Sequence, residues 1–313
     1  MNQVFTIPDE DAGQRLDVWC VSHMPALSRA ALQKLIKEGH ITVDEKPVKP
    51  KHIVQAGSVV AISAPDPKPV EAPTELPTIP ILHEDSDIVV IDKPAGIAVH
   101  PAATSSSAAT VSDWFAARYP NAHIGEAGRY GIVHRLDKDT SGVLVLAKTQ
   151  QGYERLKEQF KRHRVRKEYL ALVFGIPTGR DGRIVQPIGR SSRNPSRRTV
   201  ISGGKSFETT QGKPAITEWR VERTFGNDYT LLRVFPFTGR THQIRVHLHF
   251  IGNPIVGDAL YVIKKQRPPA GTKRQLLHAE SLTLQLTSGK KKTFIAPLAQ
   301  DFEEVLEQIQ NPT

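Results

Sequence analysis

Residues 131–147 have the sequence GIVHRLDKDTSGVLVLA, a polar loop that runs directly into an unbroken apolar stretch. The apolar part, 143–147, is typical of a strand that is buried on both faces. Small and polar residues at 140–142 allow a tight turn and let a ligand approach the backbone closely. The loop therefore holds two carboxylates, Asp137 and Asp139, against the core of the predicted sheet.

The residue types in this loop leave more than one interpretation open. A solvated turn with two capping acids would account for Asp137 and Asp139. A glycosidase pair would need a second acid at a defined separation in space, which sequence spacing does not supply. A calcium loop is excluded because its twelfth position requires a bidentate acid, and that position is the cation Lys148.

Outside this loop, predicted strands and helices follow one another without strict alternation. Apolar and alternating segments predict strands at 88–91, 143–147, 167–174, 217–224, 230–236 and 282–286. Helical spacing of apolar residues predicts helices at 111–119, 151–163 and 302–309. Because several strands are close neighbours in sequence, the pattern favours an α+β fold with a mixed or antiparallel sheet.

A smaller unit precedes this region. Helices are predicted at 11–24 and 29–37, and strands at 41–43 and 58–62. Residues 64–80 contain prolines at 65, 67, 69, 73, 77 and 80, which indicates a semi-rigid linker. We therefore expect a small α/β domain at 1–63, a linker at 64–80 and a larger domain at 81–313.

The 313 residues include 42 Lys and Arg and 32 Asp and Glu, which gives a formal net charge of +10. Residues 1–64 carry 7 basic and 7 acidic side chains, residues 65–80 carry 1 and 3, and residues 81–313 carry 34 and 22. A basic excess of this size favours a polyanionic partner, either nucleic acid or an anionic membrane. We expect its binding surface in the larger domain.

Cysteine and histidine usage, together with the lack of long apolar stretches, excludes several classes of protein. The one cysteine, Cys20, excludes an intramolecular disulfide and a thiolate metal cluster. His242, His247 and His249 lack acids at ligand spacing, so no metal site is predicted. No apolar run approaches the roughly 18 residues of a membrane span, and residues 1–12 do not form a secretion signal. We expect a cytoplasmic monomer with no membrane partner.

Five ordered segments resemble the motifs of the RluA/RluD-type pseudouridine synthase family. They are 93–96 with 100–101 (KPAG and HP), 134–137 with 140–142 (HRLD and TSG), 167–173 (KEYLALV), 239–247 (GRTHQIRVH) and 277–279 (LHA). The resemblance covers essentially the whole chain. Residues 15–39 are similar to the small RNA-binding domain first seen in a ribosomal small-subunit protein. Asp44, Glu45 and Ser58 depart from the usual pattern of that domain, which indicates weak RNA binding by residues 1–63 alone.

This resemblance implies an enzyme that isomerises uridine to pseudouridine in RNA, without a cofactor or a metal. It implies that Asp137 is the catalytic carboxylate, whereas Asp139 lies outside the matched position. Tyr169 would stack on the base and help to move its proton, and Arg245 would orient Asp137 and keep it ionised. The alternative roles are a core tyrosine and an arginine on a surface strand.

The resemblance also implies the substrate. Structured RNA is expected, most of all large-subunit ribosomal RNA or a ribosome precursor. The alternatives are a transfer-RNA pseudouridine synthase and a non-catalytic RNA-binding or ribosome assembly factor. The target uridine must leave its stack to reach the carboxylate. Basic runs and matched motifs give the candidate RNA-binding residues Arg29, Arg135, Arg162, Arg164, Arg166, Arg190, Arg193, Arg197, Arg198 and Arg240.

Overall fold

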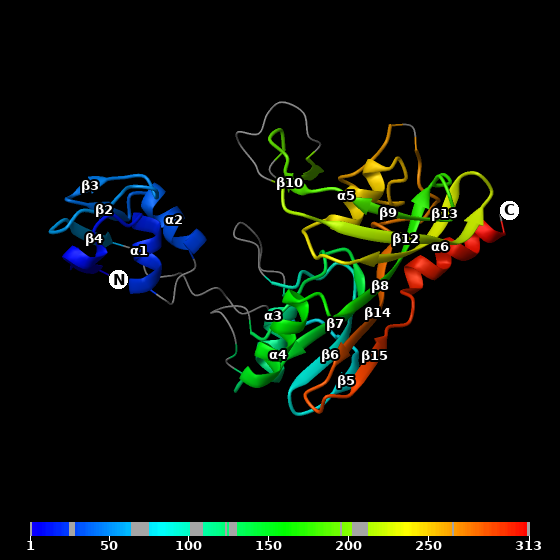
Figure 1. The fold of residues 1–313 in the computed structure, drawn as a ribbon, viewed down its shortest axis with the longest axis horizontal. Coiled ribbons are helices and arrows are strands. Elements are labelled where there is room, and N and C mark those ends of the chain that lie inside the picture. Colours follow the sequence, from blue (N-terminus) through cyan, green and yellow to red (C-terminus); the bar gives the residue numbers. More distant parts are fainter. Residues whose placement is uncertain are drawn as a thin grey trace. The chain divides into compact units, whose positions relative to one another are not determined.

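A computed structural model describes residues 2–24, 29–63, 75–100, 109–122, 124, 130–194, 196–201, 212–264 and 266–311. Contacts divide the chain into two compact units (Figure 1). The principal division falls between Leu76 and Pro77. Each unit has a sheet and a hydrophobic core of its own.

Within its described residues, the first unit is a four-stranded antiparallel sheet packed against two helices. The sheet has the order β1-β4-β2-β3, with β1 (Asn2–Thr6), β2 (Ile41–Val43), β3 (Lys46–Pro47) and β4 (Val59–Ser63). The helices are α1 (Leu16–His23) and α2 (Arg29–Lys37), and a short 3-10 helix occupies Asp9–Asp11. Trp19, Leu32 and Ile62 are buried in its core. The predicted α/β character of this unit is confirmed.

The helix predicted over 11–24 is wrong at its N-terminal end. Gly13 has φ +85°, a left-handed conformation that interrupts a helix and favours glycine. The Leu16 amide donates to the His52 carbonyl, which joins the start of α1 to the segment before β4. The strand β1 was not predicted from the sequence.

In the described part of the second unit, nine strands form one mixed sheet. Their order is β5-β6-β7-β14-β8-β13-β12-β9, and β15 pairs with β14. The bounds are β5 (Ile81–Glu84), β6 (Ile88–Lys93), β7 (Ser141–Ala147), β8 (Arg166–Phe174), β9 (Asp181–Val185), β12 (Ile216–Phe225), β13 (Tyr229–Pro236), β14 (Leu277–Gln285) and β15 (Lys291–Ile295). Two further strands, β10 (Ile188–Arg190) and β11 (Arg198–Val200), pair with each other. Only β7 and β14 pair in parallel within the nine-stranded sheet, so the predicted mixed sheet is confirmed.

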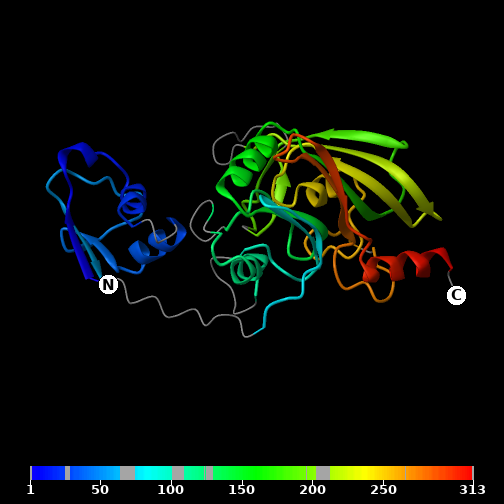
Figure 2. The ribbon, with the colours of Figure 1, turned by 90° about the horizontal axis from the view of Figure 1, so that it is seen from below.

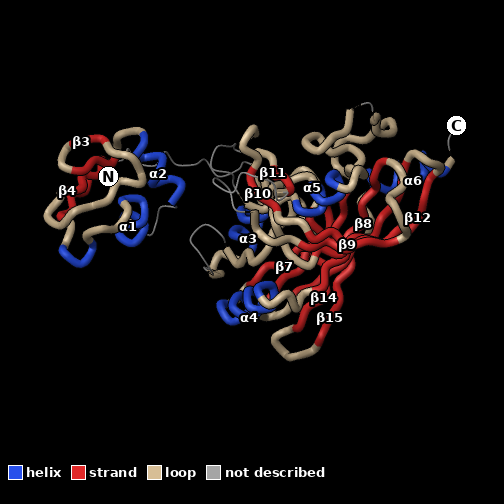
Figure 3. Tube along the Cα trace, turned by 45° about the horizontal axis from the view of Figure 1, so that its top comes forward, coloured by secondary structure: helices blue, strands red, loops and turns tan. Residues whose placement is uncertain are grey.

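Helices pack against this sheet at several places (Figure 3). α3 (Val111–Arg118) and α4 (Gln150–Lys161) pack against β6 and β7. On β8 and β13, α5 (Gln243–Phe250) contacts the face that carries Ala171 and Leu232, whereas α6 (Gln300–Gln310) contacts the face that carries Leu172 and Leu231. Figure 2 shows α6, in red, at the opposite end of the unit from α3 and α4. The sheet is therefore covered on both faces where β8 lies.

Glycines fix both ends of the loop at 131–142. Gly131 has φ +70°, and a Cβ there would lie 2.1 Å from the Ala147 carbonyl oxygen. Gly142 has φ +110°, and a Cβ there would lie 2.2 Å from the Ala279 carbonyl oxygen. All residues of β7 are buried, as predicted for a strand covered on both faces. The polar loop is therefore held close to the centre of the sheet.

Several predicted elements of the second unit differ from the structure. The arginine motif forms the helix α5, which follows His242 in a left-handed conformation with φ +57°, so the surface strand considered for Arg245 is wrong. The strand predicted at 282–286 begins earlier, at Leu277, because its first residues pair with both β7 and β8. The strands β5, β9, β10, β11 and β15 were not predicted. They are short, and in β9 only Ile184 is buried, so the alternating pattern is missing.

Candidate active site

A cavity of about 600 Å³ lies beside the 131–142 loop. Its walls come from this loop, from the end of α4, from β8 and from the segment that leads into α5. The side chains predicted to be catalytic, Asp137, Tyr169 and Arg245, all line it. A cavity of this size is typical of sites for small molecules and can hold a nucleotide base with its ribose.

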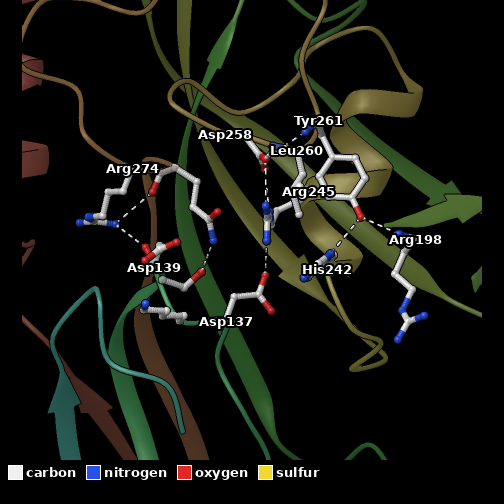
Figure 4. A network of polar contacts seen from close by, with 12 residues as sticks. Asp137, Asp139, Arg198, His242, Arg245, Asp258, Leu260, Tyr261 and Arg274 are labelled. Atoms are coloured by element: carbon white, nitrogen blue, oxygen red, sulfur yellow. Dashed lines mark hydrogen bonds and ion pairs between the residues drawn. The ribbon is translucent and has the colours of Figure 1, made fainter. Parts of the chain in front are cut away.

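Arg245 lies between two carboxylates (Figure 4). Its Nη1 donates to Oδ2 of Asp137 at 3.0 Å, while Nε and Nη2 donate to the two oxygens of Asp258 at 2.6 and 2.9 Å. The side chains of Asp137, Arg245 and Asp258 are 16%, 6% and 0% exposed. Burial alone would lower the pKa of Arg245, but the bonds and charge of Asp258 and Asp137 raise it. The guanidinium is therefore a fixed positive charge that orients Asp137.

Asp258 was not predicted as a site residue. Besides Arg245, its Oδ1 accepts hydrogen bonds from the Leu260 and Tyr261 amides at 2.8 and 3.0 Å. The Tyr261 ring lies beside the guanidinium, with Cζ of Arg245 5.2 Å from the ring centroid. The sequence holds one signal for it, since Asp258 closely follows the apolar residues 255–256. An acid in an apolar segment suggests a buried carboxylate, which requires a charged or hydrogen-bonded partner. That signal did not identify the partner.

A buried lysine holds the backbone next to Asp137. Lys93, at the end of β6, is 0% exposed, and its Nζ donates to the carbonyls of Pro94, Ile97 and Lys138 at 2.7, 3.0 and 3.0 Å. Burial lowers the pKa of Lys93 to about 7. The three carbonyls match the three protons of the ammonium form. Lys93 therefore ties the loop to the turn that follows β6.

A buried arginine holds the next carbonyl of the loop. Arg274 donates through Nη1 to the Asp139 carbonyl at 3.1 Å and through Nη2 to Oγ of Ser141 at 3.2 Å. Its Nε and Nη2 also donate to the carboxylate of Asp301, on α6, at 2.6 and 2.7 Å. The neighbouring Gln275 donates to Oγ1 of Thr140 at 3.1 Å. The loop is therefore connected to the C-terminal helix, a connection that the sequence did not predict.

Tyr169 is half-buried on β8, where it packs against two hydrophobic clusters. Burial, and then the charge of Asp137, raise the pKa of its hydroxyl. The phenol is therefore protonated at neutral pH, and its ring forms part of the cavity wall. This placement makes Tyr169 available to contact a base in the cavity.

The histidine of the loop has a structural position. His134 Nε2 accepts a hydrogen bond from the Val145 amide at 3.1 Å, and its ring stacks on Phe160 with centroids 4.5 Å apart. Burial, and then the charge of Lys167, lower the pKa of His134 to about 3. The neutral ring therefore ties the start of the loop to β7.

Two of the candidate RNA-binding arginines line the cavity. Arg135 is exposed, and its Nη1 lies 3.2 Å from Nε2 of His100. Arg240 is half-buried, and its Nε donates to the Pro214 carbonyl at 3.1 Å. Both positions are consistent with contact to an RNA strand that enters the cavity.

The remaining candidates differ in their surroundings. Arg162 and Arg166 form ion pairs with Glu158 and Glu168, so part of their charge is already neutralised. Arg164, Arg190 and Arg193 are exposed. Arg197 and Arg198 are half-buried, with the Arg197 guanidinium 5.3 Å from the Tyr261 ring centroid and the Arg198 amide bonded to its hydroxyl at 2.8 Å. The side chain of Arg29, the first residue of α2, lies outside the described residues.

Two further features concern the described residues as a whole. None of their helices is both long enough and apolar enough to cross a membrane. Within the same ranges, no group of three or more His, Cys, Asp and Glu is placed to hold a metal ion. His242, which directly precedes α5, contacts the Tyr261 hydroxyl through its Nδ1 at 2.9 Å rather than belonging to such a group.

Comparisons with known proteins match both units. The sequence profile of the RNA pseudouridylate synthase family matches residues 87–250, and that of the S4 domain matches residues 14–60. The chain is 42% identical over 310 residues to an RNA pseudouridine synthase of Chloroflexus aurantiacus, covering 99% of this chain and 94% of that protein. It is 37% identical over 307 residues to ribosomal large subunit pseudouridine synthase D of Pseudomonas aeruginosa, covering 95% and 92%.

A solved structure supports the same assignment. The human protein RNA Pseudouridylate Synthase Domain Containing 4 superposes with a TM-score of 0.58 at 25% identity, covering 74% of this chain and 93% of that chain. The family predicted from the motifs is confirmed, as is the small RNA-binding domain at the N-terminus. The chain therefore belongs to the RNA pseudouridine synthase family, and it is an isomerase that carries an RNA-binding S4 domain.

Proposed function

We propose that this enzyme isomerises uridine in large-subunit ribosomal RNA with Asp137 as its catalytic carboxylate, in the cytoplasm and without a cofactor. The observation that carries the proposal is the 3.0 Å pair between Arg245 and Asp137 in the wall of the cavity. The substrate class is supported by the large-subunit name of the Pseudomonas aeruginosa relative and by the S4 domain.

The reaction moves one bond of the nucleoside. The bond between the ribose and nitrogen 1 of uracil breaks, the uracil turns, and carbon 5 bonds to the same ribose carbon. Carbon 5 loses its proton and nitrogen 1 carries one at the end, so atoms and electrons balance without an oxidant or a metal. Asp137 can attack the ribose, attack the base or promote elimination from the ribose, and each route uses its carboxylate.

The other two residues act around this carboxylate. Arg245 contacts Asp137 and is itself fixed by Asp258, which sets the direction of the free Asp137 oxygen. Tyr169 offers a flat apolar surface for the detached uracil, and its protonated hydroxyl can exchange a proton with the base. Arg135 would contact the strand from which the uridine has been displaced.

The test is conversion of uridine in transcribed large-subunit ribosomal RNA labelled with tritium at carbon 5, since that hydrogen is released during isomerisation. Asp137→Asn should lower the single-turnover rate about a thousandfold or more, because an amide does not replace a carboxylate in any of the three routes. The matched control is Asp139→Asn, since Asp139 lines a neighbouring cavity rather than the one that holds Tyr169. Comparable losses from both variants, or rapid conversion by Asp137→Asn, would contradict the proposal.

A further inference from the structure

An exposed pair of rings adjoins the wall of the cavity. His163 and Phe237 stack with their centroids 5.0 Å apart and their planes 29° from parallel. Phe237 is 54% exposed, and His163 is exposed as well. His163 lines the cavity, as do Pro236 and Thr238 on either side of Phe237. We call this pair the rim platform.

The backbone beneath Phe237 is fixed on both sides. The Phe237 amide donates to the Ile216 carbonyl at 3.0 Å. The Thr238 carbonyl accepts a hydrogen bond from Nζ of Lys167 at 3.0 Å. The Thr238 hydroxyl, Oγ1, donates to Oε1 of Gln243 at 2.7 Å. The ring is therefore exposed on a rigid support, and binding a ligand would not require ordering of this segment.

The other ring is held by the end of α4. His163 follows the helix in a left-handed conformation with φ +54°, and its amide donates to the Phe160 carbonyl at 3.2 Å. The next amide, that of Arg164, donates to the Gln159 carbonyl at 2.9 Å. This helix termination directs His163 out of the helix and toward Phe237.

Two cations flank His163 along the chain. Lys161 and Arg164 are exposed, and Lys161 lines the cavity together with His163. Aromatic faces interleaved with lysine and arginine are the features by which proteins bind single-stranded nucleic acid, with bases on the rings and phosphates on the cations. A protein partner would favour a larger apolar surface without this charge.

We propose that the rim platform stacks an unpaired RNA base that flanks the target uridine. The inference rests on the proposed function only for the position of the target uridine, since His163 lines the same cavity as Asp137. A flipped uridine leaves its neighbours without a stacking partner, and the rim platform would replace that partner. Stacking is tolerant of sequence, so the site would select unpaired bases rather than one particular base.

The experiment measures binding of the full chain to a short single-stranded oligouridylate that carries 2-aminopurine beside its central uridine. Phe237→Ala and Phe237→Leu should each weaken binding about tenfold and lose the fluorescence quenching caused by stacking. Phe237→Trp should retain both, because it keeps a π face. The slope of log affinity against log salt should stay unchanged in all three variants, since no phosphate contact is removed.

The matched control is Phe250→Ala, which removes another exposed phenylalanine, at the end of α5 and outside the rim platform, and should bind as wild type. Wild-type affinity and quenching in Phe237→Ala would overturn the proposal, and so would wild-type behaviour of Phe237→Leu. The experiment measures binding and not conversion of uridine. A negative result for the rim platform therefore leaves the proposal for Asp137 unaffected. An active Asp137→Asn enzyme would likewise leave the rim platform standing.

Discussion

The charged cluster beside the cavity and the rim platform are built in opposite ways. In the charged cluster, Asp137, Arg245 and Asp258 are 16%, 6% and 0% exposed, and each contacts an oppositely charged side chain. At the rim, Phe237 is 54% exposed and Arg164 faces solvent. On the proposed function, the groups for bond rearrangement would be fixed before RNA arrives, whereas the rim would stay open to bind a polyanion. Loss of a buried contact should therefore slow the chemical step, and loss of a rim residue should weaken binding.

The largest effect on the chemical step outside Asp137 is expected from Asp258→Asn. The amide can no longer hold Arg245 with two anionic oxygens, so the guanidinium and the Asp137 carboxylate lose their relative orientation. Misplacement of a reacting group by about 1 Å costs on the order of a hundredfold in rate. Single-turnover tritium release at saturating enzyme should fall by that factor while RNA affinity is retained.

The control for this prediction is Asp228→Asn, which changes an exposed aspartate in the turn between β12 and β13. It should leave the single-turnover rate within about twofold of wild type, because Asp228 does not line the cavity and exposed substitutions of this kind perturb the fold little. A normal rate in Asp258→Asn would show that Arg245 does not need its second carboxylate. Weakened RNA binding with a normal chemical step would place Asp258 with the rim instead.

A smaller loss is expected where the loop is joined to the C-terminal helix. Arg274→Lys keeps the charge but not the planar fork that contacts Asp139, Ser141 and Asp301. We expect about a tenfold lower single-turnover rate and a lower melting temperature. Because a structural role alone would lower only the melting temperature, both quantities are measured.

Asp301→Asn should reproduce part of this loss, since it weakens the anchor of Arg274 while leaving the loop contacts in place. Glu303→Gln, an exposed acid on the same helix, is the matched control. An unchanged rate in Arg274→Lys, measured below its melting temperature, would show that the contact between α6 and the 131–142 loop does not affect the chemical step.

The smallest effect on the chemical step is expected from removal of the S4 domain. A shortened protein should begin at Pro77 rather than at Ile81, because Ile79 is buried in the core of the second unit and the Pro80 carbonyl accepts from the Asp92 amide. It should keep the single-turnover rate at saturating enzyme and bind long RNA more weakly, since a tethered domain raises effective concentration. Normal binding with a lost chemical step would reverse this division of roles.

The sequence predicted the elements whose signals are local. The apolar run at 143–147 indicated a strand buried on both faces. The contact between Asp137 and Arg245, which lie 108 residues apart, was expected from the resemblance of their motifs to a known family and not from a local pattern. The contacts of Arg274 were missed because its partners lie at 139, 141 and 301, and no pattern within one segment encodes such a distance. The edge strand β9 was missed because only one of its side chains is buried.

The α5 helix shows a different limit of the sequence. Its eight residues are too few for a reliable apolar period, and its N-terminus depends on the left-handed conformation of His242. Histidine adopts that conformation more often than most residues do, but far less often than glycine, so it is only a weak signal for it. The burial of Arg245 follows from this helix and therefore could not be predicted either.

The central claim is that Asp137 converts uridine in large-subunit ribosomal RNA, and pseudouridine mapping in cells tests it most directly. Ribosomal RNA is mapped chemically in cells that lack this protein and in the same cells complemented with wild type or with Asp137→Asn. We predict that at least one large-subunit site loses its pseudouridine and that only the wild-type protein restores it. An unchanged large-subunit map, or restoration by Asp137→Asn, would contradict the account.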